Sequence, residues 1–374
     1  MNEGDAATRF MALALQLARQ AVGLSDPNPR VGCVIVSADG QSVLGQGHTQ
    51  RAGEAHAEVM ALREAAARGH STRGATAYVT LEPCSHQGRT GPCCDALLTA
   101  GIGRVVAATV DPNPLVRGQG LARLRAGGVD VQIGPGETET RALNVGFFHR
   151  MEHGLPWVRM KVAMSLDGTT ALENGASQWI TSPEARADGH AWRARAGAIL
   201  TGIGTVLDDD PTLDVRLAPA PRQPTIVVVD SRLQTPVDAK LFTGTRPTWI
   251  ATAIRDHDRE TALRERGADL LHLPGAGGKV DLGALMRELA ARHVNELHVE
   301  AGHMLNGSLL KAGLVDELLV YMAPRLLGAG RPLAALGPLQ TLTEALPLAF
   351  HSADPMGSDL RVLARVQRPL SNPA

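Results

Sequence analysis

The chain has few aromatic residues and no excess of charge, and these shortages exclude whole classes of protein. Phe, Trp and Tyr make up 3% of its 374 residues, and the formal net charge is −1. An extended base-stacking surface and a nonspecific attraction to nucleic acid or anionic membranes are therefore not expected. No run approaches the roughly eighteen consecutive apolar residues that a membrane span needs. We expect neither nucleic acid nor a membrane among the partners.

Cysteine is also scarce, with four residues in all: Cys33, Cys84, Cys93 and Cys94. The N-terminal sequence carries acidic residues where a secretory signal is basic, and it lacks a small-residue cleavage site. A cytoplasmic, reducing location is expected. There a structural disulfide is the weaker interpretation of the cysteines, and a local role for the thiols is the stronger one.

The length predicts two domains, each able to bury a core of its own. In the first half, helical periodicity at 10–21, 55–68, 92–101, 121–126 and 137–148 alternates with apolar strand patterns at 31–36, 75–81, 104–110 and 129–133. This order predicts a three-layer α/β domain over residues 1–150. The turn-like HGLP sequence at 153–156 marks the boundary.

A second α/β domain is predicted over residues 151–374. Its apolar stretches are expected to be strands that each deliver a polar or glycine-containing segment, at 158–168, 177–182, 197–207, 225–231, 248–252 and 296–302. Open α/β sheets bind ligands at such strand ends. The sequence PAPRQP at 219–224 is expected to be a surface loop within this domain.

Three residues of the first half have the types and order of zinc ligands. His56, Cys84 and Cys93 supply one nitrogen and two sulfurs, and catalytic zinc sites combine three protein ligands with one water. Glu58 follows the histidine at the start of the same predicted helix, so it can reach that water without binding the metal. Pro92 places Cys93 at a helix start, which favours the thiolate. A catalytic zinc site with Glu58 as the proton carrier is predicted.

This pattern is that of the zinc-dependent base deaminases, in which H-x-E precedes P-C-x-x-C and the glutamate is general acid and base. The chain departs from it only in the gap between Cys84 and Cys93, which holds eight residues. Cys94 points about 100° around its helix from Cys93, so we expect it to be a buried packing residue. Cys33, within a strand, receives the same interpretation.

The eight-residue gap and two DPNP sequences offer polar groups for a substrate. His86 and Arg89 lie in the gap and suit a phosphate or a polar ring edge. Asn28, in the first DPNP, and Asp111 with Asn113, in the second, could contact a pyrimidine edge. The alternative for each is a turn-forming residue beside proline. We favour function for Asn28 and His86 and leave the others open.

Nucleotide-binding motifs in the second half are weak. No G-x-G-x-x-G follows a predicted strand, so a Rossmann site is not supported. TGIGT at 201–205 is typical of a tight strand-to-helix turn. EAGHMLNGSLL at 300–310 is the stronger candidate, because Gly302 and Gly307 flank a predicted helix start whose N–H groups could hold phosphates.

Long segments of both halves are typical of one family: DPNPRVGCVIV (26–36), RAGEAHAEVMAL (51–62), TLEPCSHQGRTGPCCDAL (80–97), DPNPLVRGQG (111–120), KVAMSLDG (161–168), SQWITS (177–182), TVLDDDPTLDVR (205–216) and VEAGHMLNGSLLKAGLVDEL (299–318). They resemble the bifunctional deaminase–reductase of bacterial riboflavin biosynthesis. The resemblance implies a cytidine-deaminase-like domain followed by a dihydrofolate-reductase-like domain. It also implies zinc, NADPH and a phosphorylated diaminopyrimidinone substrate, whose ribosyl chain is reduced to ribityl after deamination. A homodimer or larger homo-oligomer is implied too.

The same resemblance implies residue roles. The implied zinc ligands are His56, Cys84 and Cys93, and Glu58 transfers protons. Cofactor contacts fall on Ala163, Trp179, Thr205, Asp209, Ser231, Gly302, His303, Met304, Leu305, Asn306, Gly307 and Ser308. Substrate contacts fall on Lys161, Ser177, Arg193, Leu213, Arg216 and Glu300.

Lys161 is the best candidate for orienting the substrate of the reductase half, and no catalytic base is named there. The family commonly has two adjacent glycines after the glutamate, where this chain has Ala301 and Gly302. Two alternatives were weighed against this assignment. One is a nucleoside or tRNA deaminase with an accessory nucleotide-binding domain, which low aromaticity, neutral charge and the long cysteine gap oppose. The other is a binding scaffold with structural zinc, which would need a fourth protein ligand that Cys94 is badly placed to provide.

Overall fold

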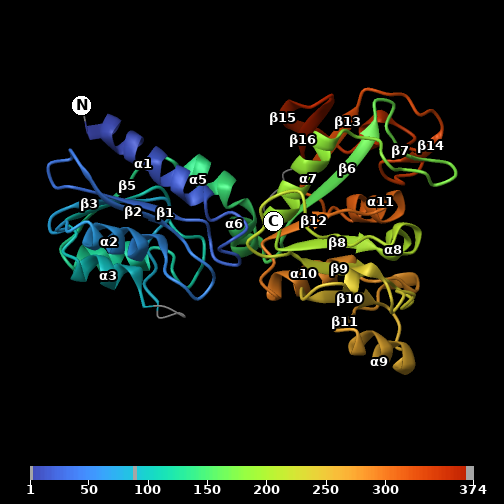
Figure 1. Ribbon diagram of the computed structural model, residues 1–374, viewed down its shortest axis with the longest axis horizontal. Helices are drawn as coiled ribbons and strands as arrows, with labels where there is room; N and C mark the ends of the chain where they lie inside the picture. Colours follow the sequence, from blue (N-terminus) through green and yellow to red (C-terminus); the bar gives the residue numbers. More distant parts are fainter. Residues whose placement is uncertain (1–2, 87–90, 368–374) are drawn as a thin grey trace. The chain divides into compact units, whose positions relative to one another are not determined.

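A computed structural model describes residues 3–86 and 91–367 of the chain. The chain forms two compact units that divide between Gly154 and Leu155, where the sequence placed the division between Arg150 and Met151. Figure 1 shows the helices and strands of both units. Within the described residues, no helix is long and apolar enough to span a membrane.

The first unit is built on a five-stranded sheet with the order β2-β1-β3-β4-β5. Its strands are β1 (Gly32–Val36), β2 (Val43–His48), β3 (Thr76–Val79), β4 (Arg104–Ala107) and β5 (Asp130–Ile133). β1 runs antiparallel to β2 and β3, and the β3–β4 and β4–β5 pairs are parallel. Every residue of β1 is buried, as expected of a strand with helices on both faces.

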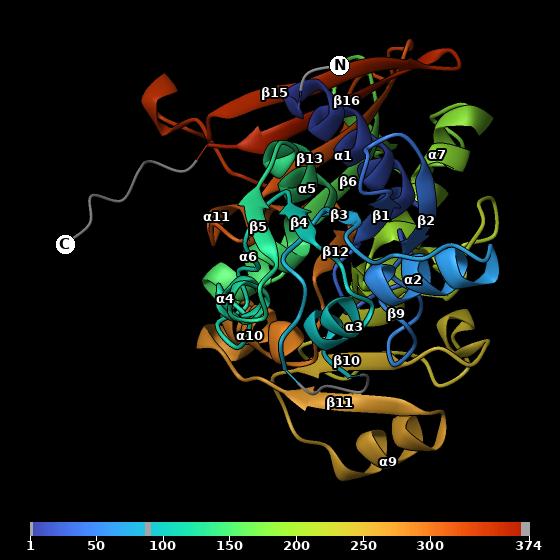
Figure 2. The same cartoon turned by 90° about the vertical axis from the view of Figure 1, so that its left-hand side faces the viewer.

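Helices cover both faces of this sheet (Figure 1, Figure 2). α1 (Glu3–Arg19) packs on one face and contacts α5 (Glu137–Leu143). On the other face lie α2 (Ala57–Ala67), α3 (Cys93–Thr99) and α4 (Gln119–Ala126), with Phe147 and Phe148 of α6 (Val145–His153) in the same core. The predicted three-layer α/β/α arrangement is confirmed.

β2 was not predicted from the sequence, because two glycines interrupt its apolar pattern. A Cβ on Gly45 would lie 2.2 Å from the Ala61 carbonyl oxygen, and one on Gly47 would lie 2.5 Å from the Met60 Cβ. The helix α2 packs so closely on β2 that no side chain fits between them. These glycines therefore mark a helix contact.

The single helix predicted over 137–148 is wrong, because it breaks at Asn144 into α5 and α6. The Asn144 side chain is buried and accepts a hydrogen bond from the Arg30 backbone N–H at 2.7 Å. Its amide donates to the carbonyls of Arg30 and Thr140 at 3.0 and 3.2 Å. Asn144 thus ties the helix pair to the segment before β1.

The second unit contains a nine-stranded sheet with the order β11-β10-β9-β8-β12-β6-β13-β16-β15. The strands from β11 to β13 in this order are parallel, while β16 and β15 are antiparallel. The strand bounds are β6 (Trp157–Ser165), β8 (Ala198–Gly202), β9 (Thr225–Val229), β10 (Thr248–Thr252), β11 (Ala268–His272), β12 (Glu296–Val299), β13 (Glu317–Ala323), β15 (Leu348–Met356) and β16 (Asp359–Val366). A separate pair joins β7 (Thr169–Leu172) to β14 (Gly330–Pro332).

Both faces of the large sheet are covered by helices. α10 (Leu282–Ala291) and α11 (His303–Lys311) share one core, and α8 (Ile203–Asp209) and α9 (His257–Glu265) share another. α7 (Pro183–Arg195) packs over β13 and β16. Three-residue 3₁₀ turns occur at Lys240–Phe242, Ala276–Gly278 and Leu342–Glu344. This mixed α/β sheet fits the predicted reductase-like architecture.

The strand predicted at 177–182 is wrong. The segment is irregular and leads into α7, where Ser182 is the N-cap and its side chain accepts from the Ala185 N–H at 3.2 Å. Trp179 is 59% exposed, so the apolar residues of this segment do not form a buried strand.

Candidate functional sites

The three predicted zinc ligands lie together in the first unit. One ligand atom each from His56, Cys84 and Cys93 falls within 4.8 Å of the other two. The His56 Nδ1 atom is 3.6 Å from the Cys84 sulfur and 3.3 Å from the Cys93 sulfur. Neighbouring ligands of tetrahedral zinc are separated by about 3.5 Å, given typical Zn–N and Zn–S bonds. The donor types and their spacing fit a zinc ion with three protein ligands.

Helix starts and a strand end position these ligands. His56 is the residue before α2, and Cys93 is the first residue of α3. Cys84 follows β3 by five residues, and its sulfur accepts a hydrogen bond from the Cys93 backbone N–H at 3.3 Å. The carbonyl oxygen of the next residue, Ser85, accepts from Arg123 at 3.1 Å. The chain between the two cysteines is therefore anchored at its beginning.

The cluster favours a thiolate. A hydrogen bond from Cys93 lowers the pKa of the Cys84 thiol. Burial acts in the other direction, but a second hydrogen bond, from His56, lowers the pKa further, and the result is a pKa of about 4. The same bond to Cys84, together with burial, raises the pKa of Cys93. The bond with Cys84 also raises the pKa of His56, against the effect of burial. At least one sulfur is thus in the form that binds zinc.

Glu58 lies buried in the first turn of α2, next to the metal cluster. Burial, and then the charge of Cys84, raises the pKa of its carboxyl to about 7. A carboxyl group with a pKa near neutrality can both take up and release a proton at physiological pH. Its position and its chemistry suit a proton carrier.

The two remaining cysteines have the packing roles that the sequence predicted. Cys94 is fully buried, and its thiol donates to the carbonyl oxygens of Pro83 at 3.3 Å and Gly120 at 3.4 Å. Burial raises its pKa to about 12. Cys33 is fully buried within β1. All four cysteines lie in the described part of the chain and are free thiols.

Sequence reasoning missed Glu82. Its buried carboxylate accepts four backbone hydrogen bonds, from Asp111 at 3.1 Å, Gly118 at 2.9 Å, Gly120 at 2.8 Å and Leu121 at 3.3 Å. It therefore holds the 111–120 segment against the chain that delivers Cys84. The available signal was a carboxylate placed directly after an apolar strand and two residues before a ligand.

The polar residues proposed for substrate contact differ in their surroundings. Asp111 is buried and accepts from the Asn113 N–H at 2.8 Å, and burial raises its pKa to about 7. Asn28 is partly buried in a turn in which Ser25 donates to its carbonyl at 3.1 Å. His86 is exposed. Arg89 lies outside the described residues.

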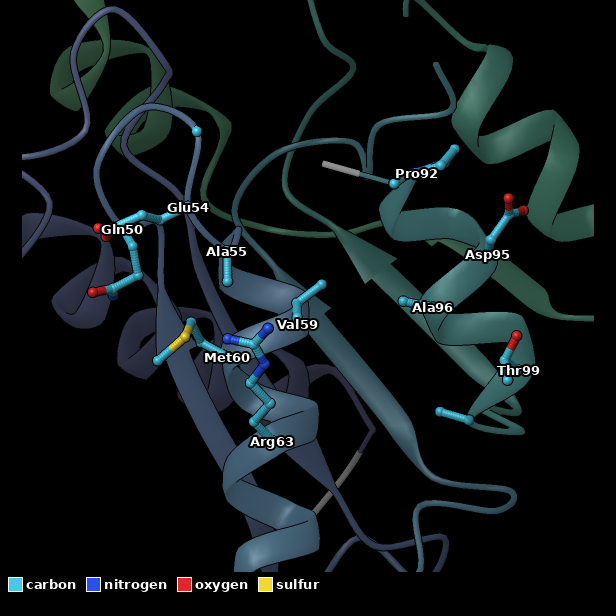
Figure 3. A pocket seen from close by; sticks show the side chains of 13 residues that line it. Gln50, Glu54, Ala55, Val59, Met60, Arg63, Pro92, Asp95, Ala96 and Thr99 are labelled. Carbon is cyan, nitrogen blue, oxygen red and sulfur yellow. The ribbon is translucent and has the colours of Figure 1, made fainter. Parts of the chain in front are cut away.

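A groove of about 1020 Å³ runs between α2 and α3 (Figure 3). Its lining includes Ala55 and Pro92, which directly precede the ligands His56 and Cys93. Its walls present Val59, Met60 and Arg63 from α2 and Asp95, Ala96 and Thr99 from α3. The ligands themselves and Glu58 are not among its lining residues, so the groove lies beside the metal cluster.

In the second unit, several predicted site residues meet at the carboxyl ends of four neighbouring strands, β9, β8, β12 and β6. Glu300 and Gly302 follow β12, Thr205 lies in α8 just after β8, and Ser231 follows β9. A Cβ on Gly302 would lie 3.9 Å from the Thr205 hydroxyl oxygen. Lys161 and Ala163 lie on β6. Parallel sheets bind ligands along this edge.

The Glu300 carboxylate is the negative group at this edge to which two cationic side chains are paired. Arg193 donates to both of its carboxylate oxygens, with the Nη2 bond at 2.8 Å, and the Lys161 amine is 3.7 Å away. Burial acts to raise the pKa of Glu300, but Arg193 and Lys161 outweigh it and hold that pKa well below its ordinary range. Arg193 also donates to the Asp214 carbonyl at 2.9 Å, so it bridges β12 and the 212–216 segment.

The side chains between Gly302 and Ser308 do not all point toward the same site. Gly302 is the N-cap of α11, His303 is partly buried, Met304 is exposed, and Leu305 packs against Gly202. Asn306 and Gly307 are instead turned toward the 333–335 segment. The Asn306 amide donates to the Leu333 carbonyl at 3.0 Å, and a Cβ on Gly307 would lie 2.5 Å from the Ala335 carbonyl oxygen. The Ser308 hydroxyl donates to the Met304 carbonyl at 3.0 Å.

The other predicted residues lie on segments around this edge. The Arg186 guanidinium lies 4.6 Å from the ring centre of Trp179. Asp209 ends α8, and burial raises its pKa. Ser177 is partly buried in the irregular segment before α7, and the Ser231 hydroxyl accepts from the Val280 N–H at 3.1 Å. Leu213 is buried with a positive φ of 51°.

Two histidines near Glu300 were also missed. The His298 Nε2 atom is 3.3 Å from a Glu300 oxygen, and His190 on α7 contacts the 212–216 segment. The signal for His298 was alternation along β12, which places residues 298 and 300 on the same face. His190 carried no signal, because its contact is to a backbone group distant in sequence.

Comparisons with known proteins find matches for both units of the chain. The family model for the cytidine and deoxycytidylate deaminase zinc-binding region matches residues 5–109, and that for the RibD C-terminal domain matches residues 156–362. The chain is 47% identical to riboflavin biosynthesis protein RibD of Escherichia coli (strain K12), covering 94% of this chain and 97% of that one. It is 40% identical to RibD of Aquifex aeolicus (strain VF5), with 94% and 96% covered.

Solved structures are similar over nearly the whole length. Acinetobacter baumannii RibD, form 1, has a TM-score of 0.89 at 37% identity, covering 98% of this chain and 100% of that one. A diaminohydroxyphosphoribosylaminopyrimidine deaminase/5-amino-6-(5-phosphoribosylamino)uracil reductase from Thermotoga maritima has a TM-score of 0.86 at 29% identity, with the same coverage.

Proposed function

The chain belongs to the RibD family of riboflavin biosynthesis proteins, and on this premise we propose which of its residues carry the two activities. It is a bifunctional enzyme. The first unit catalyses the zinc-dependent deamination of 2,5-diamino-6-ribosylamino-4(3H)-pyrimidinone 5′-phosphate. The second then uses NADPH to reduce the ribosyl side chain to ribityl.

In the deaminase site, His56, Cys84 and Cys93 would hold the zinc ion. When bound, zinc supplies a Lewis acid that activates water near neutral pH. Glu58 takes up one proton from the attacking water and passes it to the ring nitrogen. It then carries a second proton, from the hydroxyl added to the ring carbon, to the departing amine. The raised pKa of the carboxyl, about 7, suits this two-way transfer. Asn28 and His86 would contact the substrate, and Glu82 keeps the Cys84 segment in position.

In the reductase site, the carboxyl ends of β8, β9, β12 and β6 would hold NADPH and the sugar phosphate. NADPH supplies the hydride. Cofactor contacts are proposed for Thr205, Ser231 and the first residues of α11, whose backbone N–H groups at Gly302–Met304 suit phosphate. Lys161 lies next to Glu300, where it can orient the sugar. The Arg216 guanidinium pairs with the Asp214 carboxylate at 2.7 Å, but its side chain is 51% exposed. The Arg193 side chain is 14% exposed and is bonded to both Glu300 oxygens and to the Asp214 carbonyl. Arg216 is therefore the better placed cation for the substrate phosphate.

The observation that carries this proposal is the three-ligand cluster with a buried carboxyl group beside it. Purified protein given the phosphorylated diaminopyrimidinone and NADPH should release ammonia and then oxidise NADPH. A zinc chelator should stop ammonia release, while NADPH oxidation continues when the deaminated substrate is supplied. Ammonia release that persists after complete zinc removal would overturn the assignment.

We further propose a cytoplasmic location, supported by the four free thiols and by NADPH as the reductant. A homodimer or larger homo-oligomer is proposed from the family resemblance, and sedimentation velocity would test it.

A further inference from the structure

The segment from Thr212 to Arg216, between α8 and β9, has its backbone held by side chains from several places. Arg246 donates to the Leu213 carbonyl at 2.8 Å. The Gln223 side chain binds the backbone of Val215 twice. Its oxygen accepts from the Val215 N–H at 2.8 Å, and its nitrogen donates to the Val215 carbonyl at 3.0 Å. A segment held by so many side chains, with a buried residue at positive φ, is fixed in one conformation.

The end of this segment is held by His190. The His190 side chain is 5% exposed, and its Nδ1 atom accepts the Arg216 backbone N–H at 3.3 Å. Because a backbone N–H can only donate, Nδ1 must be unprotonated and any ring proton must sit on Nε2. Burial, and then the charges of Arg193 and Arg216, lowers the pKa of His190 to about 4. The imidazole is therefore neutral at physiological pH and remains an acceptor.

His190 and Arg193 are three residues apart on α7, so they lie on one face of the helix. Arg193 binds the Glu300 carboxylate and the Asp214 carbonyl. His190 holds the peptide N–H of Arg216, two residues further along. One helix face thus fixes the distance between Glu300 and the peptide from which the Arg216 side chain extends.

We propose that His190 is a positioning residue of the reductase. Its unprotonated Nδ1 holds the Arg216 peptide, and this keeps the half-exposed Arg216 guanidinium, which pairs with Asp214 at 2.7 Å, within reach of the substrate phosphate. The role rests on the proposed function, since it requires that the sugar phosphate bind between Glu300 and Arg216. His190 does not touch the reacting atoms. Its contribution is to substrate binding, and it acts through Arg216.

Two substitutions of similar shape distinguish the role of His190 as a hydrogen-bond acceptor from a role in packing alone. In His190→Asn the side-chain oxygen takes the place of Nδ1 and can still accept the Arg216 N–H. In His190→Leu a methyl group stands there and cannot. One hydrogen bond corresponds to roughly a fivefold to tenfold change in an equilibrium. We expect His190→Leu to raise the KM for the deaminated substrate about fivefold to tenfold, with kcat and the KM for NADPH unchanged. His190→Asn should stay within about twofold of the unaltered enzyme.

Two further measurements on the same samples control for misfolding of the variants. Ammonia release by the first unit and the affinity for NADPH, measured on the same samples, show that each variant is folded. If His190→Leu and His190→Asn have the same substrate KM, or if His190→Leu loses NADPH and substrate affinity together, the acceptor role is refuted. If the unaltered enzyme fails to oxidise NADPH with the deaminated substrate, the proposed function itself fails, which is a different result.

Discussion

Two adjacent cysteines show how far function depends on single residues. Cys93 and Cys94 are adjacent in α3, yet the Cys93 sulfur lies beside His56, while the Cys94 thiol is bonded to the backbone carbonyls of Pro83 and Gly120. The rotation of about 100° per helical residue is sufficient to separate their roles. Burial alone does not distinguish them, because both are buried.

This difference gives a matched pair of variants. We expect Cys93→Ala to lose stoichiometric zinc and all deamination, because two ligands remain. Cys94→Ala should keep zinc and activity and lower the free energy of unfolding by about 1 kcal/mol through lost packing. Metal analysis and denaturant unfolding of the two proteins would decide. Zinc loss in Cys94→Ala would mean that the wrong sulfur has been assigned.

At the scale of elements, the helices and strands that could be predicted from the sequence are those with a strong local pattern of apolar residues. The buried strands β1, β3 and β9 are continuous apolar runs, and the ligands at the starts of α2 and α3 follow from residue types and proline. β2 and the break at Asn144 could not be predicted, because both depend on contacts between distant segments. The same holds for His190, whose partner is a backbone N–H distant in sequence. Glu82 has a local signal in its place directly after an apolar strand, but its backbone partners lie 29 to 39 residues further along the chain.

The close packing of α2 on β2 is testable through glycine. A Cβ at Gly45 would lie 2.2 Å from the Ala61 carbonyl oxygen, whereas one at Gly91 meets no atom of the described residues within 4 Å. We expect Gly45→Ala to destabilise the first unit by about 1–3 kcal/mol, since the helix that begins after His56 must shift. Gly91→Ala is the control and should be nearly neutral. Equal denaturation midpoints for the two variants would contradict the packing described.

At the scale of the whole molecule, the groups proposed for the two activities fall in different units of the chain. The metal cluster and Glu58 belong entirely to the first unit, and the residues around Glu300 belong entirely to the second. Each activity should therefore be removable by a substitution that leaves the other intact.

The most direct measurement is NADPH oxidation by the Glu58→Gln protein, supplied in turn with the diamino substrate and with its deaminated product. Glu64→Gln, on the same helix, is the control for loss of a carboxylate. We expect the Glu58→Gln protein to retain stoichiometric zinc and to lose deamination by a factor of about 10² or more. It should then oxidise almost no NADPH with the diamino substrate, and oxidise it at the unaltered rate with the deaminated one. Normal oxidation with the diamino substrate, or loss of oxidation with both, would contradict the assignment of two separate sites acting in this order.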